Sequence, residues 1–291
     1  RRTESRIMTI APPDDGHTLT TTVSIARART RRRRYRPRKA ILGAVGILIF
    51  LLIWEGASRL GLADPRYLPP PTEVFPRLFQ VVALGDFWVA VGQTLLAWGI
   101  GLAIATVLAC VLGVVIGLSP FLRRFTNSTV EFLRPVPSVA LIPLAVLLFG
   151  LRIESSLLLI VYAAFWQIFI QVLYGVADVD TVAMATGRSY GFSKWQRVRD
   201  IVFPTTLPYL MTGLRLAAAV ALILAITAQL IIGTPGLGAE ILKAQNGGQY
   251  ATMYALMLAT GFIGVLINVG ARALERATLS WHQSVRGEAS A

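Results

Sequence analysis

Six long apolar segments, separated by short polar and charged stretches, divide this chain of 291 residues. A helix needs about 20 predominantly apolar residues to cross the hydrocarbon core of a bilayer. The segments that reach or approach this length cover residues 40–54 (with an extension towards 62), 88–120, 135–151, 155–177, 205–233 and 244–271. The pattern therefore predicts an all-α, polytopic membrane protein with six transmembrane helices.

The third segment differs from the others because it holds three prolines within nine residues, Pro135, Pro137 and Pro143. Proline lacks a backbone N–H, and its ring clashes with the preceding helical turn. A helix in this segment must therefore bend or begin late. Such a broken helix is consistent with the wall of a cavity, and a kinked packing helix is the alternative.

The charges between the apolar segments favour one orientation in the membrane. Lys and Arg concentrate in the cytoplasmic loops of membrane proteins. With the N-terminus inside, the inner loops hold ten Lys or Arg residues and the outer loops hold five, before the first 39 residues are counted. We therefore expect both termini in the cytoplasm.

The first 39 residues carry twelve Lys or Arg against three acidic residues, a net +9 out of the +13 of the whole chain. A strongly basic chain can bind nucleic acid, but a basic run directly before an apolar segment is typical of an orientation signal that contacts anionic lipid. We expect no nucleic-acid partner. The predicted organisation is a disordered basic cytoplasmic tail over 1–39, a transmembrane domain over 40–282 and a cytoplasmic tail over 283–291.

The composition and the distribution of reactive residues exclude several kinds of site. The chain is 55% hydrophobic and only 15% charged, and its one cysteine, Cys110, lies in an apolar run. No apolar segment holds the clustered acids or histidines that acid–base catalysis or a proton relay needs. None of the three lysines precedes Ser or Thr, so the phosphate-binding sequence G-x-x-x-x-G-K-[ST] cannot occur. We expect no metal site, no catalytic residue and no ATP hydrolysis by this chain.

Small residues recur at every fourth position of the second segment. Because they lack bulk, two helix backbones can approach closely along such a stripe. We predict packing against a neighbouring helix of the same bundle, and a sliding surface for a moving helix pair is the alternative. The stripe consists of Ala97, Gly101, Ala105, Ala109, Gly113 and Gly117.

Amides and hydroxyls inside the apolar segments are candidates for lining the pathway of a polar solute. The same groups can form interhelical hydrogen bonds, each worth roughly 1 kcal/mol. Both readings stay open, and packing is favoured for any single residue. The candidates are Gln93, Ser138, Gln167, Gln171, Thr227 and Gln229.

A polar, basic loop over residues 185–204 separates the fourth and fifth segments. Gly191 can end a short helix by adopting the left-handed conformation. Ser193 can then cap a second helix with Trp195 and Ile201 on its apolar face, and Pro204 breaks the chain where the fifth segment begins. A groove on a soluble partner could hold the resulting helix–glycine–helix hairpin.

The spacing in this loop resembles the cytoplasmic EAA loop of ABC importer permeases, whose pattern is E-A-A, three residues, G, nine residues, then I-x-L-P. The EAA positions read Ala185, Thr186 and Gly187, so the glutamate is missing, whereas Gly191 and the sequence IVFP at 201–204 are present. Further collinear segments are similar to permeases of the sulfonate/nitrate/taurine group. They are WEGASRLGL at 54–62, YLPPPTEV at 67–74, LRPVPSVALIPL at 133–144 and GLG at 236–238.

This resemblance, which covers about residues 52–281, implies a type I ABC importer permease in a bacterial inner membrane. Its core permease region would cover about 88–280 and its coupling loop 178–207. The implied partners are a second copy of the chain, two cytoplasmic ABC ATPase subunits that bind ATP and Mg²⁺, and an extracytoplasmic solute-binding protein. The implied coupling residues are Ala185, Thr186, Gly187, Gly191, Ile201 and Pro204.

In that arrangement, closure of the ATPase pair would pull on the loop and tilt the helices, so that a small polar, anionic solute crosses the membrane. Two other classes of protein stay open. A stand-alone secondary transporter or channel would move solute without any ATPase subunit. A membrane-embedded enzyme would need clustered intramembrane acids or histidines.

Overall fold

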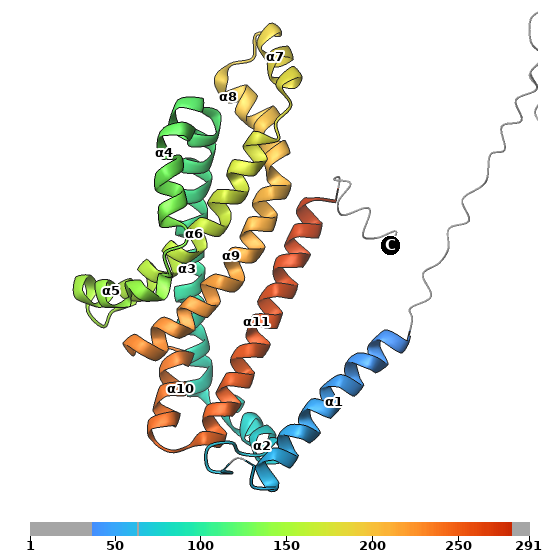
Figure 1. Cartoon of the computed structure of the whole chain (residues 1–291), viewed down its shortest axis with the longest axis vertical. Helices are drawn as coiled ribbons and strands as arrows, with labels where there is room; N and C mark the ends of the chain where they lie inside the picture. Colours follow the sequence, from blue (N-terminus) through green and yellow to red (C-terminus); the bar gives the residue numbers. More distant parts are fainter. Residues whose placement is uncertain (1–36, 63, 281–291) are drawn as a thin grey trace, which may run out of the picture. The chain divides into compact units, whose positions relative to one another are not determined.

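The computed structural model describes residues 37–62 and 64–280 (Figure 1). The predicted C-terminal tail and nearly all of the predicted N-terminal tail therefore lie outside the described residues. All regular secondary structure within the described residues is helical, as the apolar pattern predicts. In chain order the helices are α1 (Pro37–Arg59), α2 (Pro71–Val82), α3 (Gly85–Leu118), α4 (Pro120–Leu133), η1 (Ser138–Leu141), α5 (Ile142–Phe149), α6 (Ile153–Ala177), α7 (Thr181–Ser189), α8 (Lys194–Arg197), the π-helical turn η2 (Val198–Val202), α9 (Phe203–Ile232), α10 (Leu237–Asn246) and α11 (Tyr250–Thr278).

Five continuous helical stretches in the described part of the chain are long and apolar enough to cross a bilayer. They are α1, α3, α6, α9 with its N-terminal extension, and α11. The predicted sixth segment, 244–271, combines two elements, because α10 ends and α11 begins within it. Gly248 between them has a φ of +66°, a left-handed conformation that an apolar count does not register.

The third predicted segment, 135–151, does not form one straight helix. α4 and the η1–α5 piece meet at an angle of 85°. Pro135 and Pro137 lie in the connection and remove two backbone donors there. Within the predicted segment the helix begins late, at Ser138, as the prolines predict. It makes a sixth crossing only together with α4, which lies outside that segment.

The centre of the bundle is α6, which contacts α3 on one side and α9 on another (Figure 1). Lipid tails are as apolar as the side chains, so helices in a membrane associate through close packing more than through the hydrophobic effect. The small-residue stripe of α3 supplies this close contact. A Cβ atom at Gly101 would lie 2.5 Å from Cγ2 of Ile160, and one at Gly113 would lie 2.7 Å from Cγ1 of Val172. Branched side chains of α6 therefore fill the space that the small residues of the α3 stripe leave.

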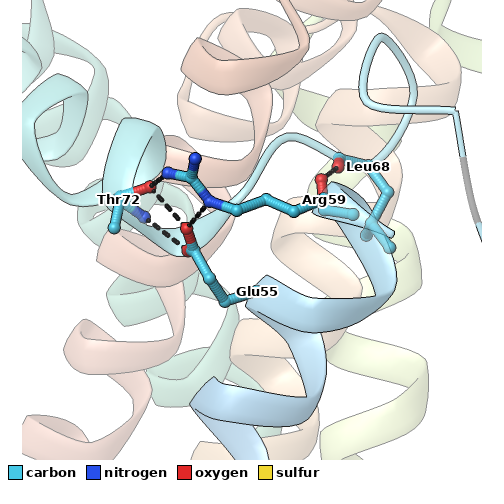
Figure 2. Close-up of polar contacts among 5 residues, drawn as sticks. Glu55, Arg59, Leu68 and Thr72 are labelled. Atoms are coloured by element: carbon cyan, nitrogen blue, oxygen red, sulfur yellow. Dashed lines mark hydrogen bonds and ion pairs between the residues drawn. The ribbon is translucent and has the colours of Figure 1, made fainter. Parts of the chain in front are cut away.

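α2 and α10 lie at one end of the bundle, whereas α4, α7 and α8 lie towards the other (Figure 1). At the first end, polar contacts join the last turns of α1 to the beginning of α2 (Figure 2). The Glu55 carboxylate accepts hydrogen bonds from Arg59 Nε, from the backbone N–H of Thr72 at 3.2 Å and from Thr72 Oγ1 at 2.9 Å. Ser58 Oγ donates to the carbonyl of Leu68 at 2.6 Å. Glu55 thus satisfies a free N–H in the first turn of α2, which no side chain within α2 caps.

Candidate functional site

The loop between α6 and α9 folds into a helix–glycine–helix hairpin, made of α7, α8 and η2 (residues 181–202), at the end of the bundle (Figure 1). Asp180 Oδ1 accepts from the N–H of Val182 at 2.8 Å and begins α7. Gly191 has a φ of +77°, the left-handed value that the turn requires. Ser193 and Gln196 then form a reciprocal capping box at the start of α8.

The two arms of this α7–α8 hairpin meet at Gly187. This glycine is buried, and a Cβ atom on it would lie 3.0 Å from Cδ1 of Ile201. The backbone N–H of Phe192 also donates to the carbonyl of Gly187 at 2.9 Å. Of the predicted coupling residues, the structure therefore brings Gly187 and Ile201 together and puts Gly191 at the turn. Ala185 and Thr186 are exposed on α7.

The expected break at Pro204 is wrong. The chain stays helical from Lys194 to Ile232 and passes through the π turn η2 just before the proline. In that turn the N–H of Phe203 donates to the carbonyl of Val198, five residues earlier. A π turn inserts one residue into a helix without ending it, and Pro204 then falls in the first turn of α9, where a missing N–H is tolerated. The hairpin is therefore continuous with a membrane-spanning helix.

The outer surface of the hairpin is aromatic and basic. Tyr190 is 79% exposed and Trp195 is 72% exposed, although the sequence pattern predicts Trp195 on an apolar, packed face. Residues 181–202 hold four Lys or Arg and one Asp, a net charge of +3. Exposed aromatic side chains next to cationic ones are typical of protein interaction sites.

Gln229, a candidate for the pathway, is instead buried at the opposite end, with 1% of its surface exposed. Its Oε1 accepts from Thr94 Oγ1 at 2.9 Å and from the N–H of Gly238 at 3.2 Å. Thr94 Oγ1 accepts from the N–H of Leu237 at 2.9 Å. The two side chains thus link the N-terminus of α10 to α9 and α3. Gln229 therefore makes interhelical hydrogen bonds, the alternative to lining the pathway.

The other pathway candidates lie on four different helices. Gln93 is exposed on α3, Ser138 lies in η1, Gln167 and Gln171 are half-buried on α6, and Thr227 is half-buried on α9. The structure does place a cavity of about 540 Å³ between α3, α4 and α6, and none of the six candidates lines it.

The wall that α4 and the residue after it contribute to this cavity is polar. The residues of this wall recur at intervals of three and four, which places them on one helical face. They are Arg123, Thr126, Asn127, Val130, Glu131 and Arg134. From the sequence alone, the arginines among them were counted only as loop charges. Ile116 of α3 and Ile170, Leu173 and Tyr174 of α6 form the facing wall.

Known proteins with similar sequences and folds are transport components. The family model described as "Binding-protein-dependent transport system inner membrane component" matches residues 105–279. The chain is 30% identical over 257 residues to the taurine transport system permease protein TauC of Escherichia coli (strain K12), which covers 86% of this chain and 92% of that protein. It is 26% identical over 244 residues to the nitrate import permease protein NrtB of Synechocystis sp.. That alignment covers 80% of this chain and 87% of NrtB.

The fold is also similar to a solved structure. A chain of the MetNI methionine ABC transporter, in inward-facing conformations, superimposes with a TM-score of 0.59 and 18% sequence identity. The match covers 66% of this chain and 95% of that one.

Proposed function

Because the chain belongs to the family of binding-protein-dependent transport system inner membrane components, it is a multi-pass permease subunit of an ABC importer, and we propose that it couples ATP hydrolysis by partner subunits to the uptake of a small oxyanion. Importers of this family work with ATPase subunits and a solute-binding protein. In this proposal the partners bind ATP and Mg²⁺, and a second copy of the chain completes the membrane unit.

The solute class is taken from the names of the relatives. Taurine carries a sulfonate group, and nitrate is itself an oxyanion, so both solutes present oxygen atoms that share one delocalised negative charge, around a tetrahedral sulfur in the first and a planar nitrogen in the second. A solute of this kind is recognised by guanidinium groups and backbone N–H donors. We assign the chain to the same chemical class of solute.

The observation that carries the coupling role is the helical continuity from the α7–α8 hairpin into α9. Trp195 at the exposed end and Ile232 at the far end of α9 belong to one uninterrupted helical stretch. α9 in turn packs on α6. A partner that grips the hairpin would therefore displace α9 and α6 together, which is a rigid-body transition between two packed states.

The proposed orientation places the α7–α8 hairpin in the cytoplasm, where an ATPase can reach it. The net charge of +3 on the hairpin agrees with the enrichment of Lys and Arg on the inner side of membranes. α4, whose sequence includes Arg123 and Arg124, lies towards the same end of the bundle (Figure 1).

The test replaces Gly191 in the chain co-expressed with the ABC ATPase encoded beside it. Gly191→Pro forces φ to about −65°, which the turn at +77° cannot accept. Gly191→Asn is the matched control, because Asn tolerates the left-handed region. We expect the proline variant to lose both co-purification of the ATPase and ATP-driven uptake in proteoliposomes, and the asparagine variant to retain them.

Two results would contradict the proposal. A proline variant with unchanged complex formation and ATPase activity would remove the hairpin from the coupling route. Uptake by the wild-type chain alone, without any ATPase, would favour the stand-alone transporter.

A further inference from the structure

The cavity between α3, α4 and α6 contains cationic groups that lack a protein partner. Arg123 and Arg134 both line it, and neither guanidinium has an ion pair or hydrogen bond with a side chain or carbonyl of the described residues. Both residues are exposed, as is Arg124, which also has no ion pair among the described residues. The arginines of this cavity are therefore available to a ligand.

The charge of the cavity favours a single monoanion. Glu131 is the one carboxylate in its lining, and its Oε1 accepts from Asn127 Nδ2 at 2.9 Å. Two guanidinium groups and one carboxylate leave a net charge of +1. One singly charged anion neutralises that excess, whereas a cation or a dianion would leave the lining charged.

The shape and chemistry of the cavity fit a small oxyanion with an apolar part. Its volume, about 540 Å³, is within the range of roughly 300–1,000 Å³ of small-molecule sites. Arg123 and Arg134, which are eleven positions apart along α4 and the residue after it, both line this cavity. Guanidinium groups donate pairs of parallel hydrogen bonds to oxyanions, and Ile116 and Leu173 supply an apolar wall.

We infer that this cavity binds one singly charged oxyanion, of the sulfonate, nitrate or phosphodiester type, through Arg123 and Arg134. That the bound oxyanion is the transported solute rests on the proposed function. The same chemistry is present in the phosphate of an anionic lipid headgroup, so the experiment separates the two sources.

The experiment uses the full chain in complex with its ATPase, in nanodiscs that contain only phosphatidylcholine. Methanesulfonate is titrated, the saturable rise in the thermal unfolding midpoint gives a Kd, and neutral dimethyl sulfone is the ligand control. We expect Arg123→Gln and Arg134→Gln each to weaken binding about tenfold, the loss of one charge-assisted hydrogen bond. The double variant is expected to abolish it.

Arg124→Gln is the matched variant, because it removes the same charge from the neighbouring position of α4 and Arg124 does not line the cavity. It should bind methanesulfonate as the wild type does. Arg134→Lys keeps the charge without the planar pair of donors and should recover part of the affinity.

A second arm replaces part of the phosphatidylcholine by phosphatidylglycerol. Stabilisation by methanesulfonate that depends on Arg123 and Arg134 supports the site with a soluble ligand. Stabilisation by phosphatidylglycerol alone, with the same dependence, supports the site with a lipid ligand. Wild-type midpoints that do not change with either ligand, or an Arg124→Gln variant that loses the stabilisation as fully as Arg123→Gln and Arg134→Gln do, overturn the inference. Complex formation is measured on the same nanodiscs, and ATP-driven uptake is measured in proteoliposomes made from the same protein preparations, so a failure of the importer function is recognised separately.

Discussion

At the α2–α10 end of the bundle the side-chain oxygen atoms of Gln229 and Thr94 are buried and hydrogen-bonded, whereas on the α7–α8 hairpin polar side chains face outward. Gln229 and Thr94 are almost fully buried and bond to the first turn of α10. Tyr190 and Trp195 on the hairpin are largely exposed next to basic residues. An unpaired polar group in a membrane interior costs several kcal/mol, so the first end is held in one arrangement. The exposed side chains of the hairpin are the ones that the proposed coupling role assigns to a partner protein.

The largest loss of stability is expected from a substitution at the most crowded position of the α2–α10 end. A Cβ atom at Gly238 would lie 2.3 Å from the carbonyl oxygen of Ile226, a backbone atom that cannot move away cheaply. Gly238→Ala should therefore lower the free energy of unfolding by about 3 kcal/mol through overpacking. The measurement is a denaturant titration of the purified chain in detergent.

The control for that variant is Gly99→Ala. No atom outside its own helix turn lies within 4 Å of a Cβ atom built there. Because Ala has a higher helix propensity than Gly, this change should be neutral or stabilise by up to about 1 kcal/mol. Equal destabilisation by the two substitutions would show that the contact between Gly238 and α9 does not hold this end together.

Substitution of an exposed hairpin residue is expected to weaken binding of the ATPase partner and to leave the stability of the chain unchanged. Trp195→Ala should weaken association with the ATPase partner about thirtyfold, the 2 kcal/mol typical of an aromatic hot spot. It should leave unfolding of the isolated chain unchanged within about 0.5 kcal/mol, because the side chain is 72% exposed. Surface-immobilised ATPase and a titration of the detergent-solubilised chain give the Kd.

Phe79→Ala is the matched variant at the opposite end, where Phe79 of α2 is 74% exposed. It should leave ATPase binding as it is. If Trp195→Ala binds as tightly as Phe79→Ala, the aromatic surface of the hairpin is not the docking surface.

The sequence pattern predicts the features that depend on neighbouring residues. The membrane helices follow from apolar runs, and the turn at Gly191 and the cap at Ser193 follow from single residues with strong local preferences. The bend after α4 follows from Pro135 and Pro137. None of these needs a partner far along the chain.

The features that sequence reasoning missed depend on distant contacts. Gln229 is a packing residue because Thr94 lies beside it, 135 positions earlier in the chain. The cavity is lined jointly by α3, α4 and α6, so residues as far apart in the chain as Arg123 and Tyr174 contribute to one lining. Trp195 is exposed because Gly187 and Ile201 already close the contact between the two arms of the hairpin.

The smallest effect concerns how well the hairpin is ordered before it meets its partner. Ser193 Oγ accepts from the N–H of Gln196 at 3.2 Å, and Gln196 Oε1 accepts from the N–H of Ser193 at 2.7 Å. Ser193→Ala removes the first bond and should cost about 1 kcal/mol of local helix stability. Hydrogen exchange at the Gln196 amide should become about fivefold faster, since this amide opens locally.

Ser189→Ala is the control, because that hydroxyl bonds within the exposed α7 and caps no helix start. ATPase binding should weaken by the same factor in Ser193→Ala alone, because the partner must then order α8 on docking. Faster exchange without weaker binding would show that the partner does not require a preformed α8.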